Sequence, residues 1–472
     1  MQTSIEGNNL KGLVDHHFHQ YILNEKYPIF YSKAVVLITF NRLDLAIKIF
    51  YLKMLVKEES DFVRDLYISH IKAFTLGSFI EPGNNNDKNS VDRYLNDFKH
   101  IYKSTALNGL DVSQSIVPLS RGNTISNGAH RVSAAFVAEQ TVPTVKLDVK
   151  DDQYDYKFFL ERGMSQAEVE AAVTKFIEYA DNCYVALIWP NAKGRQVDIA
   201  QLIPNVIYQS EVVLNLTGAH KLLSQIYFNE EWLGSEEKGY PGVKNKLVKC
   251  FNNSDSLRVI AFQENSLESV LKIKEDVRKI FSIGKHSIHI TDTQVEAIRT
   301  ARILFNQNSL HFLNHGNPNK YLSTYLQLKE FKSLLTKNDL NVDDVVIDGS
   351  VVMAVYGIRE ASDIDYLSST TMPHINNEVV DDHESELAFH QQSKSRLIYD
   401  QNYYFYFNDL KFISFQQLYT MKKSRGESKD TNDIVMMKAL LERNNFWMYW
   451  GKLRQKLYYA KAKTVISIIN VL

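Results

Sequence analysis

The sequence contains few cysteines and has no excess of charge of either sign. Cys183 and Cys250 are the only cysteines among 472 residues, which is too few for a disulfide framework or a zinc knuckle and is typical of a reducing compartment. The 54 basic and 55 acidic residues give a net charge of -1. Because this balance offers no overall attraction to a polyanion, we expect no DNA binding, and any anion-binding surface must be local.

The sequence also lacks the segments that target or anchor a protein. Its first residues contain neither the basic start nor the apolar run of a signal peptide, and no uncharged apolar stretch is long enough to cross a bilayer. The apolar share of 44% and the charged share of 23% are ordinary for a globular chain with substantial cores. We therefore expect a cytoplasmic, folded protein.

Length and changes of pattern divide the chain into regions. A chain of 472 residues is too long for one ordinary core, and no internal repeat is present. Apolar periodicity predicts helices that include one from about His130 and one over 418–441. Apolar and β-branched runs predict strands at 115–119, 141–147, 183–189, 257–262, 345–347, 363–367, 403–407 and 411–413. This alternation predicts a multidomain protein of mixed α/β class. The expected regions are an N-terminal domain at 1–175, a central α/β domain at 176–318, a third domain at 319–445 and a helical tail at 446–472.

The tail combines aromatic and basic residues. The run from Phe446 to Trp450 is followed by five lysines and arginines and by no acidic residue. This composition is typical of a helix at a membrane surface. The default interpretation is a terminal helix docked on the protein; the alternatives are peripheral contact with the inner face of the membrane and contact between subunits.

The most specific motif begins where a buried strand ends. An apolar strand at 345–347 leads to Gly349 and Ser350, and a second apolar strand carries Asp363 and Asp365. Residues two apart in a strand face the same side, so the two carboxylates can bind a hard cation such as Mg²⁺ or Mn²⁺ together. Glycine allows the backbone to approach a phosphate, and the serine and the helix that it opens supply donors to the anion. The motif therefore predicts a metal site beside a phosphate site.

This arrangement resembles the signature of the polymerase-β-like nucleotidyltransferase superfamily, over about 340–440. The resemblance implies a two-metal site that is completed by a third carboxylate on a neighbouring strand. Asp409 is the candidate for that position and Asp400 is the reserve, although Asp409 lies in a polar break that is equally typical of a turn.

The same resemblance implies basic side chains around the donor triphosphate. Arg359 lies in the loop between the two strands, and Lys422 and Lys429 lie on a lysine-bearing segment similar to one in some members of the superfamily. We take all three as candidate phosphate contacts. Two other interpretations stay open: a solvated strand end without function, and a glycosyltransferase that uses the Asp-x-Asp pair, which does not require the upstream Gly-Ser.

A second motif, at residues 125–145, resembles the ParB/sulfiredoxin-like fold, with a resemblance that extends at most over 40–150. Its residues are Asn127, Gly128, His130 and Arg131, followed by a helix of small residues. The glycine forms the turn, and the two basic residues at the helix start can grip a phosphate. Members of this fold bind nucleotides in DNA partition, reduce sulfinic acids or phosphorylate small hydroxyl compounds. The region has no cysteine suited to sulfinic-acid reduction, and no helix-turn-helix that would support DNA partition is recognisable. Of the three activities, the kinase is therefore the expected one.

A kinase of this type requires a general base near the acceptor hydroxyl. Glu81 is the candidate, and an ordinary exposed loop carboxylate is an equally frequent outcome at such a position. Arg42 and Asp44 are further candidate site residues in the same region.

Together the patterns predict a metal-dependent enzyme that transfers a nucleotide from a nucleoside triphosphate to a small acceptor, such as a sugar or alditol phosphate. An N-terminal kinase would supply the phosphorylated acceptor, a sequence of reactions that suits surface-polysaccharide biosynthesis. Two other classes stay open: a nucleotidyltransferase toxin or a modifier of RNA or protein, and a nucleotide-sensing binding protein without turnover. The nucleotide, the acceptor and the oligomeric state are left open.

Overall fold

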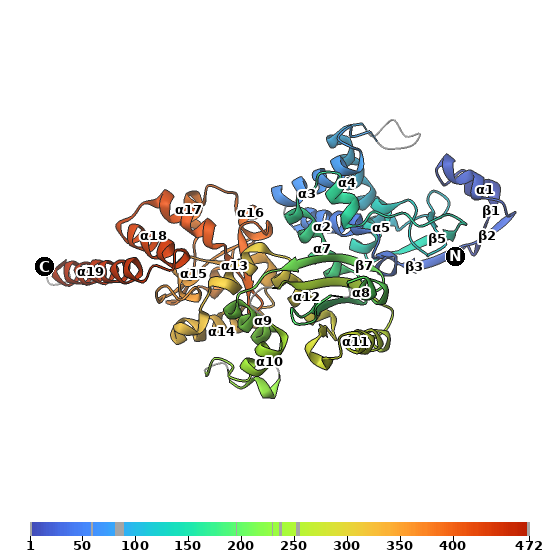
Figure 1. Cartoon of the computed structure of the whole chain (residues 1–472). Coiled ribbons are helices and arrows are strands. Elements are labelled where there is room, and N and C mark those ends of the chain that lie inside the picture. The colour runs from blue at the N-terminus through green and yellow to red at the C-terminus, as the bar shows by residue number, and fades with distance from the viewer. Residues whose placement is uncertain are drawn as a thin grey trace. The chain divides into compact units, whose positions relative to one another are not determined.

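The computed structural model describes residues 2–57, 60–80, 89–194, 196–228, 230–235, 238–251 and 255–469. The chain is a mixed α/β protein with several sheets, as predicted (Figure 1). It forms two units: the first comprises Met1–Glu211 and Leu257–Ala301, and the second comprises Val212–Ser256 and Arg302–Leu472. These limits differ from the expected regions, because most of the central sheet belongs to the first unit.

The first unit begins with a short strand pair and a three-stranded sheet. In the three-stranded sheet, β5 pairs with β3 in antiparallel and with β4 in parallel orientation, and α5 connects the two parallel strands. The predicted strand, helix, strand unit is thus confirmed. The elements are β1 (Ser4–Glu6), α1 (Gly7–Lys11), β2 (Lys26–Pro28), β3 (Phe30–Lys33), α2 (Leu43–Lys57), α3 (Asp61–Phe74), α4 (Val91–Asn108), β4 (Val117–Leu119), α5 (Ala129–Val137) and β5 (Thr141–Lys146).

A four-stranded sheet forms the rest of the first unit. Its strand order is β7-β8-β6-β9, and β6, with every residue buried, pairs in antiparallel orientation with β8 and β9. Burial of both faces explains why the sequence of β6 is continuously apolar rather than alternating. The elements are α6 (Tyr156–Glu161), α7 (Gln166–Tyr179), β6 (Cys183–Ile188), α8 (Gln196–Leu202), β7 (Val206–Val212), β8 (Leu257–Gln263), α11 (Leu267–Phe281), β9 (Ile288–Ile290) and α12 (Gln294–Leu304), of which β7 and α12 end in the second unit.

The second unit is built on a five-stranded mixed sheet with the order β12-β11-β10-β14-β13. Strand β10 lies in the middle and is buried throughout; it runs antiparallel to β11 and parallel to β14. The sheet and the helices before it are β10 (Val345–Asp348), β11 (Ile364–Ser368), β12 (Val380–Asp382), β13 (Tyr404–Phe407), β14 (Leu410–Ile413), α9 (Leu216–Ile226), α10 (Val243–Cys250), α13 (Gln307–His315) and α14 (Leu322–Lys337).

The remaining helices of the second unit follow strands of this sheet. They are α15 (Ser350–Val355), the 3-10 helix η9 (Glu384–His390), α16 (Lys394–Tyr399), α17 (Phe415–Arg425), α18 (Ser428–Leu441) and α19 (Asn445–Ile469). The sequence pattern predicted one helix over 418–441, but Gly426 adopts a left-handed conformation with φ of 69° and ends α17. This is a common way to end a helix, and α18 restarts with a capping box between Glu427 and Asp430.

The lengths and compositions of the helices bear on whether the chain crosses a membrane. Throughout the described part of the chain, no helix combines the length and the apolar character needed to cross a bilayer.

Candidate functional site

The end of β10 and the start of β11 bring the predicted motif together. The antiparallel register places Asp348 directly opposite Asp365. Gly349 follows with φ of 65° and ψ of -140°, a backbone conformation that only glycine adopts readily. A Cβ atom at this position would overlap the Asp365 carboxylate. Glycine is therefore required here both by the backbone and by the contact with the carboxylate.

The Asp365 carboxylate has an unusual electrostatic environment. Among the described residues, none donates a hydrogen bond to it, whereas Asp363 accepts one from Ser362 at 3.0 Å. Burial, together with the neighbouring charges of Asp363 and Asp348, raises the pKa of Asp365 to about 6, against the opposing effects of His383 and Lys422. A cation bound at this position would offset the cost of ionisation and return the carboxyl group to its charged form.

Asp348 is held by two histidines that the sequence pattern did not single out. His383 Nδ1 and His390 Nε2 each lie 2.8 Å from Asp348 Oδ2. Although burial opposes ionisation of both groups, the two histidines hold the pKa of Asp348 well below its usual range, and Asp348 in turn raises the pKa of His383. The second oxygen, Oδ1, is buried and has no hydrogen-bond partner among the described residues.

The backbone and a glutamine orient the two imidazoles. The N–H of His383 donates to the Tyr366 carbonyl and so extends the pairing of β12 with β11. Gln417 Nε2 lies 3.3 Å from His390 Nδ1 and donates to the His390 carbonyl at 2.7 Å. This geometry favours the tautomer in which His390 Nδ1 accepts and Nε2 donates to Asp348.

Two of the three predicted phosphate contacts lie near the carboxylate pair. Arg359 binds Asp433 through two hydrogen bonds of 2.7 and 2.8 Å, and Lys422 Nζ lies 2.8 Å from the same carboxylate. Although burial opposes it, the pKa of Arg359 is raised by Asp433 and, to a smaller extent, by Tyr459 and Asp363. Both cations are thus close to the pair, but they are held by Asp433.

The third predicted contact, Lys429, lies in the first turn of α18. Its Nζ pairs with Glu427 at 3.0 Å, and both side chains are partly exposed. The structure does not join Lys429 to the carboxylate pair, so its role as a phosphate contact stays a prediction.

The prediction that Asp409 supplies the third carboxylate is wrong. Asn408 and Asp409 form the two-residue turn between β13 and β14, both with positive φ, and Asp409 pairs with Lys332 at 2.8 Å. Because β14 runs parallel to β10, with Phe412 opposite Ile347, this turn lies at the end of the sheet away from Gly349. The carboxylate belongs to a turn because Asn and Asp tolerate positive φ.

The reserve candidate, Asp400, is also committed elsewhere. It is buried and accepts hydrogen bonds from the backbone and the side chain of Asn402 at 3.0 and 2.9 Å. Arg396 lies 3.5 Å away.

The register of the edge strand indicates a different third carboxylate. Strand β12 runs parallel to β11 and places Asp381 directly opposite Asp365. Asp381 accepts a hydrogen bond from Asn376 at 3.1 Å. Across the described residues, no three His, Cys, Asp or Glu side chains are grouped closely enough to hold a metal ion by themselves. Any cation here would therefore need oxygen ligands from a substrate or water as well.

The N-terminal motif is assembled at the start of α5. Gly128 has φ of 88°, and the Arg131 guanidinium packs against it while donating to Ser115 Oγ and the Ile116 carbonyl. Asn127 binds Asp15, and His130 Nε2 lies 2.9 Å from the Tyr67 hydroxyl. The motif residues come together, and Asn127, His130 and Arg131 each bond to protein groups, so their role in binding phosphate stays a prediction.

Arg42 and Asp44 belong to a buried ionic network. Two hydrogen bonds of 2.9 Å join them, and Lys48 Nζ lies 2.8 Å from Asp44 and 3.0 Å from His70 Nε2. Burial, followed by the charge of Lys48, lowers the pKa of His70 well below its usual value. The candidate base, Glu81, lies outside the described residues.

Comparisons of the chain with protein-family models, with curated proteins and with solved structures find no match.

Proposed function

We propose that this protein is a metal-dependent nucleotidyltransferase, which transfers a nucleoside monophosphate from a nucleoside triphosphate to a small phosphorylated acceptor. The observation that carries the proposal is the Asp365 carboxylate. It lies beside Asp363 and against Gly349, has no hydrogen-bond donor among the described residues, and has a pKa raised to about 6. A half-buried carboxylate pair to which no cationic side chain of the described residues donates a hydrogen bond, next to a glycine, suits a cation bridged to phosphate oxygens.

The donor set fits Mg²⁺ or Mn²⁺. Asp363 and Asp365 would hold the ion, and Asp381, opposite Asp365 on the neighbouring strand, would add negative charge beside the site. Phosphate oxygens and water would complete the coordination, as is usual for Mg²⁺. The bound ion would neutralise charge on the transferring phosphate and favour ionisation of the acceptor oxygen.

The other residues of the site would bind and orient the triphosphate. The backbone of Gly349, which carries no Cβ, would allow a phosphate to approach closely. The buried Ser350 Oγ, without a hydrogen-bond partner among the described residues, would supply a donor. The two histidines on Asp348 would hold the end of β10 in position against the segment that follows β12. Arg359 and Lys422, both bound to Asp433, keep positive charge near the carboxylate pair, where it offsets part of the negative charge of the donor.

Pyrophosphate release tests the proposal directly. The full chain is incubated with each nucleoside triphosphate, Mg²⁺ and a metabolite extract, and both pyrophosphate and new mass peaks are followed. We expect release with one or more nucleotides, and loss of at least about 100-fold in Asp363→Asn and in Asp365→Asn. Asp409→Asn is the matched control, since it makes the same change at the other end of the sheet.

The acceptor distinguishes the classes that remain. A labelled sugar or alditol phosphate supports the proposal, whereas label on RNA or protein would assign a toxin or modifying enzyme, and nucleotide binding without pyrophosphate would indicate a sensor. Release that needs no metal, or that survives in both aspartate variants, contradicts the proposed site.

A further inference from the structure

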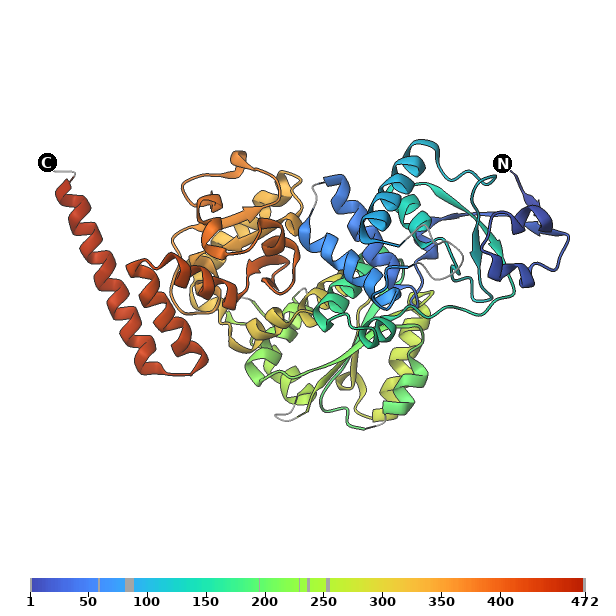
Figure 2. The same cartoon turned by 90° about the horizontal axis from the view of Figure 1, so that it is seen from above.

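The terminal helix α19 contacts its neighbour through a glycine and a glutamine. It packs beside α18, as Figure 2 shows. The contact is made through Gly451, where a Cβ would crowd the Met436 side chain, and through the buried Gln455, which accepts a hydrogen bond from Asn432 at 2.9 Å. A helix that only docked on its own protein would be expected to bury its apolar side chains there.

The apolar side chains of α19 instead face outward. Phe446, Trp450, Leu453 and Leu457 are 67%, 43%, 36% and 62% exposed. Their spacing of four, three and four residues places them in one stripe along the helix. Gly451 and Gln455 lie two residues before and after Leu453, which is about half a turn around the helix. The exposed stripe is therefore opposite the face that contacts α18.

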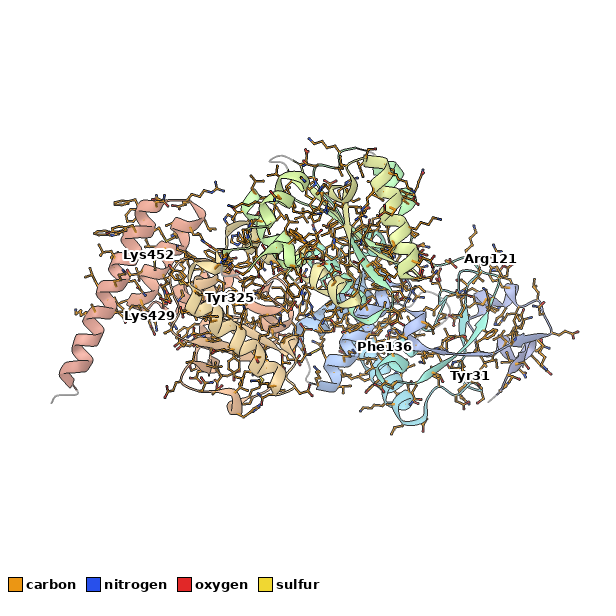
Figure 3. All side chains as sticks on the ribbon, turned by 90° about the horizontal axis from the view of Figure 1, so that it is seen from below. Tyr31, Arg121, Phe136, Tyr325, Lys429 and Lys452 are labelled. Carbon is orange, nitrogen blue, oxygen red and sulfur yellow. The ribbon has the colours of Figure 1, made fainter. Side chains whose placement is uncertain are left out.

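Positive charge borders this stripe on both sides. Arg454 follows Leu453 and Lys456 precedes Leu457, so the two cations lie on opposite flanks of the stripe. Lys452, labelled in Figure 3, and Lys461 are also on the helix. No acidic residue occurs from Asn445 to the end of the chain, whereas the whole chain has a net charge of only -1. The tail thus concentrates positive charge beside exposed aromatic and aliphatic groups.

We propose that α19 docks on an anionic lipid surface, with its apolar stripe in the headgroup region and its flanking cations on the lipid phosphates. Tryptophan and tyrosine favour this boundary, and each nearby lysine or arginine adds attraction to anionic lipid. A second copy of the helix fits less well, because two such faces would bring cations together with no carboxylate between them. The proposal does not depend on the proposed enzyme activity.

Vesicle binding by the full-length protein tests the apolar stripe. We expect co-sedimentation with phosphatidylcholine vesicles that contain phosphatidylglycerol, and at least about tenfold weaker binding to phosphatidylcholine alone. Changing Phe446, Trp450 and Leu457 together to serine should weaken binding to the anionic vesicles at least about tenfold. Leu23→Ser with Leu107→Ser is the matched control, since both leucines are 84% exposed and lie outside the tail.

Reversal of charge tests the electrostatic part. Arg454→Glu with Lys456→Glu should weaken binding to anionic vesicles and leave weak binding to neutral vesicles unchanged, and 0.5 M salt should weaken wild-type binding in the same way. Circular dichroism should stay unchanged, because the altered side chains are exposed. The proposal is overturned if wild type binds both vesicles equally or neither, if the tail variants bind like wild type, or if wild type forms a dimer that the stripe variant loses.

Discussion

Asp348 shows how one buried charge can organise the end of a strand. Its carboxylate receives both His383 and His390 on a single oxygen, and both partners come from the segment that follows β12. The loss of either partner would leave a buried charge with less compensation, which is costly in a protein interior. The interaction therefore links the end of β10, directly before Gly349, to the segment after β12 that includes η9.

The charge of Asp365, unlike that of Asp348, is poorly compensated in the folded protein. We therefore expect neutralisation of Asp365 to raise the free energy of unfolding. Because its folded pKa of about 6 lies above the unfolded value near 4, ionisation of Asp365 destabilises the fold as pH rises through this range. In metal-free protein, Asp365→Asn should raise the free energy of unfolding by about 1–3 kcal/mol at pH 8 and change it little at pH 4. Urea denaturation at the two pH values measures this difference.

Added Mg²⁺ provides the control for this prediction. It should raise the unfolding temperature of wild type, because it binds the folded state, and should raise that of Asp365→Asn much less. Asp409→Asn should respond to Mg²⁺ like wild type. An equal response of wild type and Asp365→Asn would show that the ion binds elsewhere.

At the scale of elements, two glycines with positive φ have different reasons for being glycine. Gly349 joins β10 to α15 in a conformation open only to glycine and touches Asp365, whereas Gly426 joins α17 to α18 in the left-handed helical region. A Cβ at Gly426 would meet nothing closer than 4.0 Å. Gly349 is therefore required both by its backbone conformation and by the lack of space for a Cβ atom. Gly426 is required by its backbone conformation only.

This difference predicts unequal costs for the same substitution. Gly426→Ala should lower the free energy of unfolding by about 1 kcal/mol, the usual cost of the left-handed conformation. Gly349→Ala should cost about 3 kcal/mol or more, because overlap with Asp365 adds to the backbone strain, and it should also abolish nucleotide binding. Urea denaturation and nucleotide titration of both variants provide the test. Equal costs, with nucleotide bound normally by Gly349→Ala, would make Gly349 an ordinary turn residue.

At the scale of the molecule, the two units carry two separate motifs. The proposed nucleotidyltransferase site lies wholly in the second unit, and the Gly128 to Arg131 motif lies in the first. If the first unit is the kinase that supplies the phosphorylated acceptor, a mutation in its motif should reduce phosphate transfer without reducing nucleotidyl transfer by the second unit.

Arg131→Ala should reduce phosphate transfer to the free acceptor at least about tenfold, because charge-assisted hydrogen bonds to phosphate are lost. Pyrophosphate release should survive when phosphorylated acceptor is supplied. Arg121→Ala is the matched control, since Arg121, labelled in Figure 3, is exposed and pairs with Asp148. Thermal unfolding must be followed in parallel, because Arg131 also bonds Ser115. Unchanged phosphate transfer in a folded Arg131→Ala protein would contradict the phosphate-binding role expected for Arg131.

Local patterns in the sequence were sufficient to predict several elements of both units. Apolar and β-branched runs predicted β6, β8, β10, β11, β13 and β14, and the strand, helix, strand unit around α5. The motif around Gly349 could also be predicted, because Asp363, directly before β11, and Asp365, on β11, lie only two residues apart in the sequence. These features depend on residues that are close in sequence.

Only the tertiary structure decided what surrounds that motif. Strand order places Asp381 beside Asp365 and Asp409 at the far end of the sheet, and it brings His383 and His390 to a carboxylate 35 and 42 residues earlier in the chain. No local periodicity encodes such contacts, because they depend on which strands pair and in which register. The orientation of α19 was decided in the same way: its composition is typical of an interfacial helix, but packing against α18 determined that the apolar stripe faces outward.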